Sequence, residues 1–175
     1  MSILVNKEAP NFTAQAVMPN GVMESLSLDQ FRGHYVVLFF WPLDFTFVCP
    51  TEIIAHNKRV AAFEERDVQL IGCSIDSQFT HAAWRNTPVN QGGVGDLDYA
   101  LAADMNHEIC KAYGIESDGG DSYYPAGAAM RATFVIDQNG IVRSQVVNDE
   151  PIGRNMDEVV RVIEALQFFK ENGQV

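Results

Sequence analysis

The sequence predicts an α/β fold in which a mixed central sheet is flanked by helices. Nearly continuous apolar runs rich in Val, Ile and Phe alternate with segments whose apolar residues recur at helical spacing. Uninterrupted apolar runs are typical of strands buried on both faces. Strands that alternate with helices in this way favour a sheet covered by helices. The 175 residues contain no repeat, low-complexity tract or linker, so we expect one domain over residues 1–175.

The first third of the chain predicts a hairpin, a buried strand and a helix. An Asn-Gly pair at 20–21 lies between two apolar runs, which indicates a hairpin turn. Residues 34–41, HYVVLFFW, are expected to form a strand. Residues 50–66 predict a helix, because Pro50 suits a first-turn position and Glu52 suits the positive end of the helix dipole.

The remainder of the chain continues the alternation. We expect strands over residues 68–76, 132–137 and 141–148, the last two joined by a turn at 138–140. We expect helices over residues 81–87, 105–114 and 155–173. The last helix has an apolar face made of Met156, Val159, Val160, Ile163 and Leu166.

Composition excludes several classes of partner. The formal net charge of −11 argues against nucleic acid and anionic membranes, which both favour basic patches. The longest apolar run, YVVLFFWPL, is far shorter than the ~18 residues that span a membrane. The opening residues also lack the pattern of a signal peptide. We therefore expect a cytoplasmic protein.

Three cysteines are too few for a disulfide framework, and they lack the C-x-x-C pairs of a zinc site. Cys73 lies within a predicted strand and is expected to be a buried apolar filler. Cys110 follows His107 by three residues, with Asp104 one turn earlier, so one helix face holds three possible metal ligands. A structural metal site normally needs four ligands, and no second cluster is visible. We expect no metal and no cofactor.

Cys49 lies between a predicted strand and the helix that Pro50 begins. The free N–H groups at a helix start favour an anion, so a thiol there should ionise more readily than an ordinary cysteine. A fall of about two pKa units would make the thiolate the major form at pH 7, and the thiolate is the nucleophile. A small buried hydrophobe is the alternative, and local features leave both readings open.

Residues 39–52, FFWPLDFTFVCPTE, strongly resemble the active-site stretch of the peroxiredoxins, in particular the typical two-cysteine class. That class includes the peroxidase subunit of bacterial alkyl hydroperoxide reductase. Pro42, Thr46 and Cys49 match the family's P-x-x-x-T-x-x-C pattern, and Glu52 and Arg131 match its other active-site positions. Further similar blocks are APNFTAQAV, SIDSQFTHAAWRNT, GGVG and VVNDEPIGRNMDEVVRVIEALQFFKENG, so the resemblance covers nearly the whole chain.

The resemblance implies a thioredoxin-like fold with an N-terminal hairpin extension. It also implies a thiol peroxidase that reduces hydrogen peroxide and small organic hydroperoxides through a sulfenic acid at Cys49. Arg131 would stabilise the thiolate and the peroxide oxygens, and Thr46 would hold the peroxide in line. Pro42 would shield the pocket from water, and Glu52 would orient Arg131.

The family also implies partners. Thioredoxin or a flavoprotein disulfide reductase would be the electron donor, and the chain would form a homodimer that assembles into a ring of dimers. A ring-forming holdase chaperone is the alternative function. Thiol–disulfide exchange is disfavoured, because the helix start lacks a C-x-x-C motif.

Two features depart from the typical class. The resolving-cysteine motif V-C-P would begin where the sequence stops, at Val175, so we expect the C-terminal resolving tail to be absent. Such a chain is expected to stall after one peroxide per subunit when thioredoxin is the reductant. The stretch 116–130 is also longer than its family counterpart by about half a dozen residues. We expect a plain surface loop, with a cover over the pocket or a subunit contact, made by its two tyrosines and Pro125, as the alternative.

Overall fold

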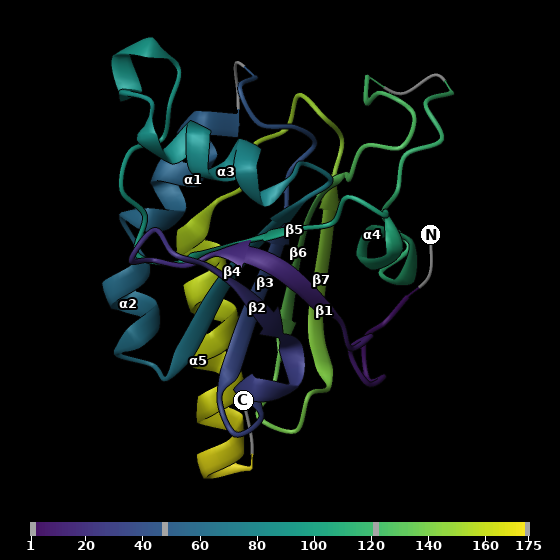
Figure 1. Ribbon diagram of the computed structural model, residues 1–175. Helices are drawn as coiled ribbons and strands as arrows, with labels where there is room; N and C mark the ends of the chain where they lie inside the picture. The colour runs from purple at the N-terminus through teal and green to yellow at the C-terminus, as the bar shows by residue number, and fades with distance from the viewer. Residues whose placement is uncertain (1–2, 47–48, 121–122, 174–175) are drawn as a thin grey trace.

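The computed structural model describes residues 3–46, 49–120 and 123–173, with Cys49 described by its backbone alone. Its centre is a mixed sheet with the strand order β2-β1-β5-β4-β3-β6-β7 (Figure 1). The strands are β1 (Thr13–Val17), β2 (Met23–Ser27), β3 (Tyr35–Phe40), β4 (Val68–Ser74), β5 (Ala100–Ala103), β6 (Arg131–Ile136) and β7 (Val142–Asn148). The α-helices are α1 (Cys49–Asn57), α2 (Val60–Glu64), α3 (Gln78–Asn86), α4 (Glu108–Ala112) and α5 (Met156–Asn172).

Strand β3 separates two apolar layers, and all six of its residues are buried, as its sequence predicts. Side chains of a strand alternate between the two faces of its sheet. Phe40 lies in the layer that α4 and the N-terminal segment cover, whereas Phe39 lies in the layer that α1, α2, α3 and α5 cover. Because both faces of β3 are covered, its sequence is apolar at every position and does not alternate with polar residues.

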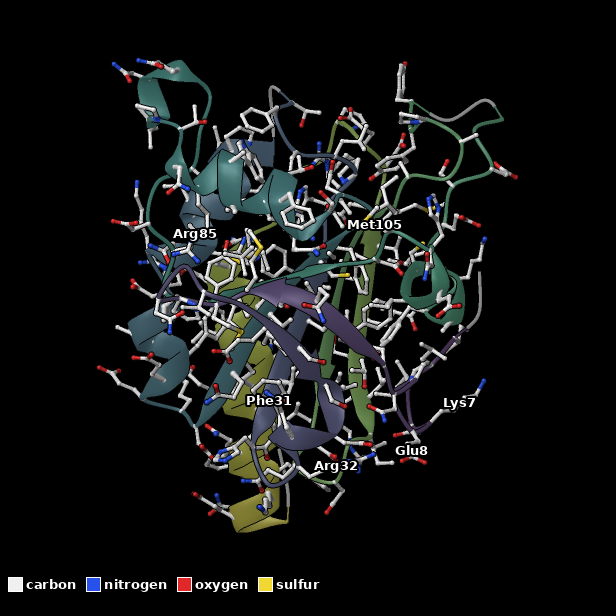
Figure 2. All side chains as sticks on the ribbon, viewed as in Figure 1. Lys7, Glu8, Phe31, Arg32, Arg85 and Met105 are labelled. Atoms are coloured by element: carbon white, nitrogen blue, oxygen red, sulfur yellow. The ribbon has the colours of Figure 1, made fainter. Side chains whose placement is uncertain are left out.

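The predicted hairpin is confirmed. Strands β1 and β2 pair in antiparallel register, and Gly21 adopts a φ of 81° in the turn. The guanidinium of Arg85 in α3 fastens this hairpin, since it donates to the carbonyl oxygen of Pro19 at 2.8 Å and to that of Met18 (Figure 2).

The helix predicted over 50–66 is interrupted. It forms α1 and α2, with a turn at Lys58 and Arg59 between them. Arg59 leaves helical geometry (φ −108°, ψ 1°), and its guanidinium bonds Asp157 of α5 at 2.8 Å. Asn57 also bonds outward, to the backbone of Asp98 at 2.7 Å. The end of α1 is therefore bonded to the segment at Asp98, whereas the start of α2 is bonded to α5.

Two predicted helices have different boundaries. Helix α3 begins before residue 81 because the Ser77 hydroxyl caps it by accepting from the backbone N–H of Thr80 at 3.1 Å. Helix α4 is shorter than 105–114, since His107 precedes it in the left-handed region at φ 60°.

The sequence reading missed β5. This strand is ALAA, and alanine is a weak strand former. It forms because two neighbours determine it, β4 in parallel and β1 in antiparallel register. Tertiary context therefore overrides local propensity here.

Helix α5 confirms the expected apolar face. Met156, Val159 and Ile163 are buried, while Val160 and Leu166 are partly buried against the same layer. Among the described residues, no helix is long and apolar enough to span a membrane.

One edge of the sheet collects the residues that the sequence singled out. Strands β3 and β4 run parallel, and β6 runs antiparallel to β3. The carboxyl ends of β3 and β4 therefore meet the start of β6. The loop after β3, the first turn of α1 and Arg131 follow from these ends.

Candidate active site

The sheet edge brings the predicted site residues together on consecutive elements. Pro42 is buried and Thr46 half-buried in the loop after β3. Cys49 is the first residue of α1, and its side chain lies outside the described part of the chain. Glu52 lies in the first turn of the same helix, and Arg131 is the first residue of β6.

The carboxylate of Glu52 is the centre of a buried ion-pair network. Its Oε2 accepts from Arg131 Nη1 at 2.7 Å and from Arg154 Nη2 at 3.1 Å. Its Oε1 accepts from the Nε and the backbone N–H of Arg154, at 3.1 and 3.0 Å. The expected Glu52–Arg131 contact is therefore present, but Arg154 makes the two-pronged one.

Arg131 is held from a second direction by Glu150. Its Nε donates to the Glu150 carbonyl oxygen at 2.7 Å, and its Nη2 donates to the carboxylate at 3.0 Å. The side chain is only 1% exposed. A planar guanidinium bonded along two edges has a fixed orientation, which a flexible lysine could not reproduce.

This network is positively charged where it is buried. Two guanidinium groups, of Arg131 and Arg154, face one buried carboxylate, and Glu150 is half-buried at the rim. Burial favours the neutral form of Glu52, but the guanidiniums of Arg154 and Arg131 outweigh it and hold the pKa of this carboxyl below its ordinary value. Glu52 is thus ionised at neutral pH and anchors two cations one turn after Cys49.

The sequence reading missed Arg154 and Glu150. Arg154 ties three elements together, because its Nη1 also donates to the carbonyl oxygens of Phe40 in β3 and Ala132 in β6, at 2.7 and 2.8 Å. In the sequence both residues lie in the block VVNDEPIGRN, which resembles the family without indicating a role for either residue.

His56 is excluded as a proton acceptor. It is fully buried and stacks on Phe39 with ring centroids 3.7 Å apart. Its Nδ1 lies 2.6 Å from the carbonyl oxygen of Glu52, which can only accept, so Nδ1 carries the proton. Burial, aided by Arg154, lowers the pKa of His56 to about 3, so the ring stays neutral.

The loop between Pro42 and Thr46 is held by Asp44. The Asp44 carboxylate accepts from Trp41 Nε1 at 2.8 Å and contacts His81 Nδ1 at 2.7 Å. Its backbone N–H donates to Asp76 at 2.9 Å. Burial raises the pKa of Asp44 against the opposing effect of His81. These bonds fix a loop in which Phe45 adopts a left-handed φ of 54°, and Thr46 Oγ1 donates to the Leu43 carbonyl oxygen at 3.1 Å.

The extended stretch 116–130 is not a plain surface loop, so that expectation is wrong. Tyr124 is only 3% exposed, and its hydroxyl accepts from the backbone N–H of Arg131 at 2.9 Å while it donates to the carbonyl oxygen of Asn148 at 2.8 Å. A buried tyrosine hydroxyl with both bonds satisfied stabilises the start of β6. Tyr123, in contrast, is 77% exposed.

The two remaining thiols are buried. Cys73 and Cys110 are both 0% exposed, which confirms the filler reading for Cys73. Burial, with the Asp104 carboxylate, raises the pKa of Cys73 and raises that of Cys110 to about 12. Neither is an accessible thiolate at neutral pH.

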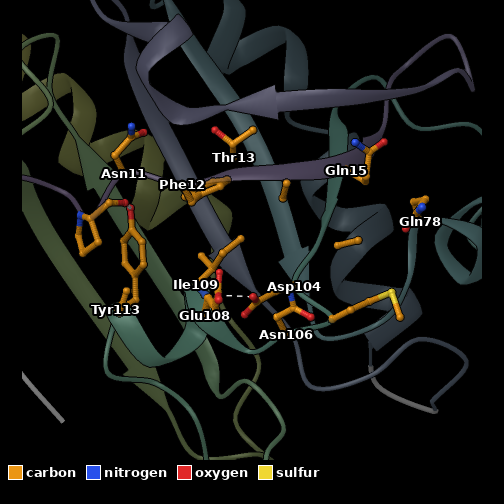
Figure 3. Close-up of a pocket in the computed structure, with 15 residues that line it drawn as sticks. Asn11, Phe12, Thr13, Gln15, Gln78, Asp104, Asn106, Glu108, Ile109 and Tyr113 are labelled. Carbon is orange, nitrogen blue, oxygen red and sulfur yellow. Dashed lines mark hydrogen bonds between the residues drawn. The ribbon is translucent and has the colours of Figure 1, made fainter.

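A sizeable cavity lies elsewhere in the described part of the chain. It measures about 420 Å³ and lies between residues 10–15 and helix α4 (Figure 3). Asn11, Gln15, Asp104 and Tyr113 are among its lining residues. Its lining includes none of the predicted site residues, so we assign it no part in the chemistry.

Comparison with known proteins identifies the family. The sequence pattern of the AhpC/TSA family matches residues 5–145. Alkyl hydroperoxide reductase C of Buchnera aphidicola (subsp. Schizaphis graminum) is 49% identical over 174 residues, which cover 98% of this chain and 85% of the relative. The chain belongs to the AhpC/TSA family of peroxiredoxins. Peroxiredoxin-1 of Gallus gallus is 46% identical, covering 98% of this chain and 83% of the relative.

Solved structures agree with this peroxiredoxin assignment. The reduced 2-Cys peroxiredoxin of Plasmodium vivax superposes with a TM-score of 0.92 at 44% identity, covering 98% of this chain and 86% of the other. The mitochondrial 2-Cys peroxiredoxin of Plasmodium falciparum gives a TM-score of 0.90 at 44% identity, covering 98% and 99%. The expected thioredoxin-like fold is therefore confirmed, and the protein is a thiol peroxidase.

Proposed function

We propose that Cys49 is the nucleophile of this peroxidase and that it reacts as the thiolate. The sulfur attacks one peroxide oxygen, an S–O bond forms, and the O–O bond breaks. The second oxygen leaves with the electron pair, takes a proton and becomes water or an alcohol. Cys49 is left as a sulfenic acid, and a later thiol reduces it with loss of water.

The observation that carries the proposal is the buried pair of guanidiniums at the start of α1. Glu52 binds both Arg131 and Arg154 one turn after Cys49. Free N–H groups at this helix start add to their positive field. A thiolate is stabilised in such surroundings, and so is the negative charge that develops on the leaving oxygen.

Pro42 and Thr46 shape the approach of the peroxide. We propose that buried Pro42 excludes water from one side of the thiolate. The Thr46 hydroxyl donates to Leu43 in the structure, so its lone pairs are directed to accept a hydrogen bond from the peroxide. The bonds of Asp44 keep both residues at a fixed separation.

Oxidation by one molar equivalent of hydrogen peroxide is the test. The reduced protein should gain one sulfenic acid per chain, which a 1,3-dicarbonyl reagent traps on the peptide that contains Cys49. Cys49→Ser should consume peroxide at least ~10³-fold more slowly, because no other thiol is an accessible thiolate. Cys73→Ser is the matched control and should match the parent. Label on Cys73 or Cys110, or peroxide consumption by Cys49→Ser, would overturn the assignment.

Hydrogen peroxide and small organic hydroperoxides are the proposed substrates, and thioredoxin or a flavoprotein disulfide reductase is the proposed electron donor. The relative named alkyl hydroperoxide reductase C supports the organic hydroperoxides. Peroxide-dependent turnover with each reductant supplied alone identifies the donor. The expected stall after one peroxide per chain with thioredoxin would point to the flavoprotein reductase, and failure of both contradicts this part. We also propose a cytoplasmic location, where free thiols such as Cys73 and Cys110 stay reduced. Recovery of the chain outside the cytoplasm after cell fractionation would contradict it.

A homodimer, assembling further into a ring, is the proposed quaternary state. Strand β7 ends the described sheet with one unpaired edge, which can accept the same strand of a second copy. Phe45 and Phe79 are 50% and 67% exposed, which suits a second apolar contact. Sedimentation of the reduced protein at micromolar concentration should give a dimer or larger. A single species of 19.4 kDa would contradict the prediction.

A further inference from the structure

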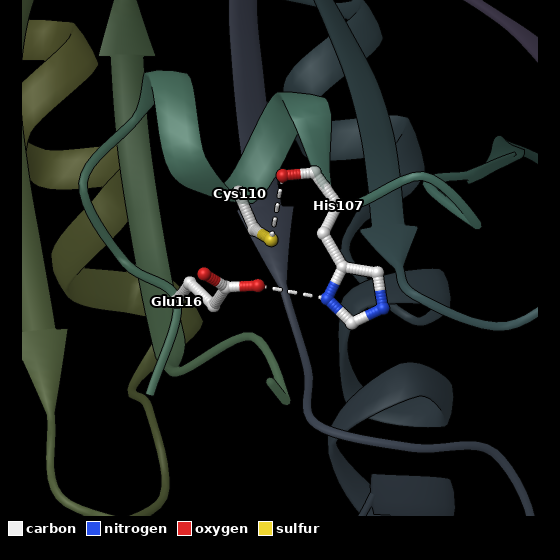
Figure 4. A group of neighbouring side chains, drawn as sticks. All are labelled: His107, Cys110 and Glu116. Carbon is white, nitrogen blue, oxygen red and sulfur yellow. Dashed lines mark hydrogen bonds and ion pairs between the residues drawn. The ribbon is translucent and has the colours of Figure 1, made fainter. Parts of the chain in front are cut away.

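Three potential metal ligands converge beside helix α4, away from the peroxidase site. The side chains of His107, Cys110 and Glu116 each offer one ligand atom, and these atoms all lie within 4.8 Å of one another (Figure 4). His107 Nδ1 is 2.8 Å from Glu116 Oε1, and Cys110 Sγ is 3.5 Å from the carbonyl oxygen of His107. In the sequence, Asp104 stands beside His107 and Cys110 as a possible ligand, no metal is expected, and Glu116 is not considered.

The backbone builds this cluster from two segments. His107 occupies the N-cap position of α4 in the left-handed conformation, and Cys110 follows within the first turn. Glu116 begins the extended stretch 116–130 and is bridged to Ala129 near its end. Gly127 of the same stretch approaches the imidazole so closely that a Cβ there would lie 3.1 Å from His107 Cε1.

Asp104 bonds the backbone at the start of α4 and does not belong to this cluster. Its two carboxylate oxygens accept from the backbone N–H groups of Ile109 and Cys110, at 3.0 and 2.8 Å. It therefore caps α4 and is not available as a ligand. It does add a buried negative charge behind Cys110.

The charges around the cluster favour a cation. Asp104 and Glu116 are both acidic, whereas Lys111 is the basic group that faces Glu116, with its Nζ 3.6 Å from Oε1. The Lys111 side chain is 59% exposed, so it can swing into solvent. A divalent ion could replace it at little cost.

We propose that His107, Cys110 and Glu116 bind one Zn²⁺ ion, with a solvent molecule as the fourth ligand. An imidazole nitrogen, a thiolate and a carboxylate oxygen are the donor types that zinc accepts in tetrahedral sites. An all-oxygen set would suit Mg²⁺ or Ca²⁺ instead, and a thiolate or thioether set would suit Cu(I). The Cys110 proton leaves to solvent when the Zn–S bond forms, and no oxidation is involved.

Zinc at this position would join α4 to the stretch 116–130. That stretch carries Tyr124, whose hydroxyl bonds the backbone of Arg131. The ion would thus stabilise the segment that supports the start of β6.

Metal binding is measured on the full chain carrying Cys49→Ser, which removes the reactive thiol as a competing ligand. After reduction and removal of bound metal, Co²⁺ serves as the optical probe and Zn²⁺ competes against a chromophoric chelator. We expect one ion per chain, with a thiolate-to-cobalt charge-transfer band in the near ultraviolet that Zn²⁺ abolishes.

Two variants test the ligands. His107→Asn keeps a residue that tolerates the left-handed backbone, and Glu116→Gln keeps the size of the side chain. Loss of an outer-shell partner costs about 10–100-fold in metal affinity, so loss of a ligand should cost at least ~100-fold. Cys110→Ala should abolish the cobalt band. Cys73→Ala is the matched control, a buried thiol outside the cluster, and should bind as the parent does.

The contradicting results are distinct. No thiolate–cobalt band in the parent overturns the proposal, and so does one Zn²⁺ per chain in His107→Asn with unchanged affinity. If Cys110→Ala fails to fold, judged by circular dichroism, His107→Asn and Glu116→Gln decide the question. Because the experiment uses Cys49→Ser, its outcome is independent of the peroxidase chemistry.

Discussion

Replacement of Arg131 by Met is expected to slow peroxide reduction by about 10²–10³-fold, the cost of removing one preorganised electrostatic group from a buried site. Methionine has similar length and no charge, so Glu52 and Glu150 lose a shared cation. The thiolate of Cys49 and the leaving oxygen then lack one of the two guanidiniums near the start of α1. Competition kinetics with limiting hydrogen peroxide measure the effect.

The variant Arg131→Lys distinguishes the effect of the positive charge from that of the guanidinium's hydrogen-bond geometry. Lysine keeps the positive charge but cannot bond Glu52 and Glu150 along two edges, so an intermediate rate is expected. Thermal unfolding of each variant shows whether the fold persists at the assay temperature. A folded Arg131→Met protein that reduces peroxide at the parent's rate would contradict the role of Arg131.

Replacement of Glu52 by Gln is expected to destabilise the fold by about 3–5 kcal/mol at pH 7, since it leaves Arg131 and Arg154 buried without their shared anion. Urea unfolding of parent and variant at a series of pH values measures the difference. Glu158→Gln is the matched control. Glu158 is an exposed carboxylate that pairs with Arg161 at the surface, so little change is expected there.

The pH dependence has a definite sign. The folded-state pKa of Glu52 is lowered from its ordinary value of 4.5 by the guanidiniums, which outweigh burial. The stability that ionised Glu52 contributes is therefore present above pH 4.5 and is lost as the pH falls through the folded-state pKa. The gap between parent and Glu52→Gln should narrow in acid. A gap that widens below pH 4.5 would show that the carboxylate is not the anchor.

The elements that the sequence predicted well are those with strong local signals. Strand β3 has an unbroken apolar run, and the hairpin has an Asn-Gly turn. Strand β5 has neither, because its ALAA sequence becomes a strand only between two neighbours. The break between α1 and α2 likewise depends on bonds from Arg59 to Asp157, 98 residues away.

The site residues likewise differ in how far the local sequence predicts them. Cys49, Thr46, Pro42 and Glu52 lie within a dozen residues, so one stretch of sequence carries their signal. Arg154 and Glu150 join the site only through the fold, from the segment between β7 and α5. In a sequence, a single arginine is normally interpreted as a surface charge, and only the structure shows that it contacts a buried carboxylate. Glu116 was missed for the same reason, since nothing in its own segment points to His107.

The ionisation of Cys49 tests the central claim most directly. The rate of alkylation is measured across pH 4 to 10, with the modified peptide identified by mass spectrometry, in the folded and the urea-unfolded protein. In the folded chain Cys73 and Cys110 are buried and should stay unmodified. We predict that folded Cys49 reacts at pH 6 far faster than the unfolded thiols do, because its pKa lies well below the ordinary thiol value of about 8.5, and that Arg131→Met moves its curve to higher pH. If the alkylation rate of folded Cys49 rises only near pH 8.5, as it does for the unfolded thiols, the result would contradict the claim that the start of α1 and its two arginines activate this cysteine.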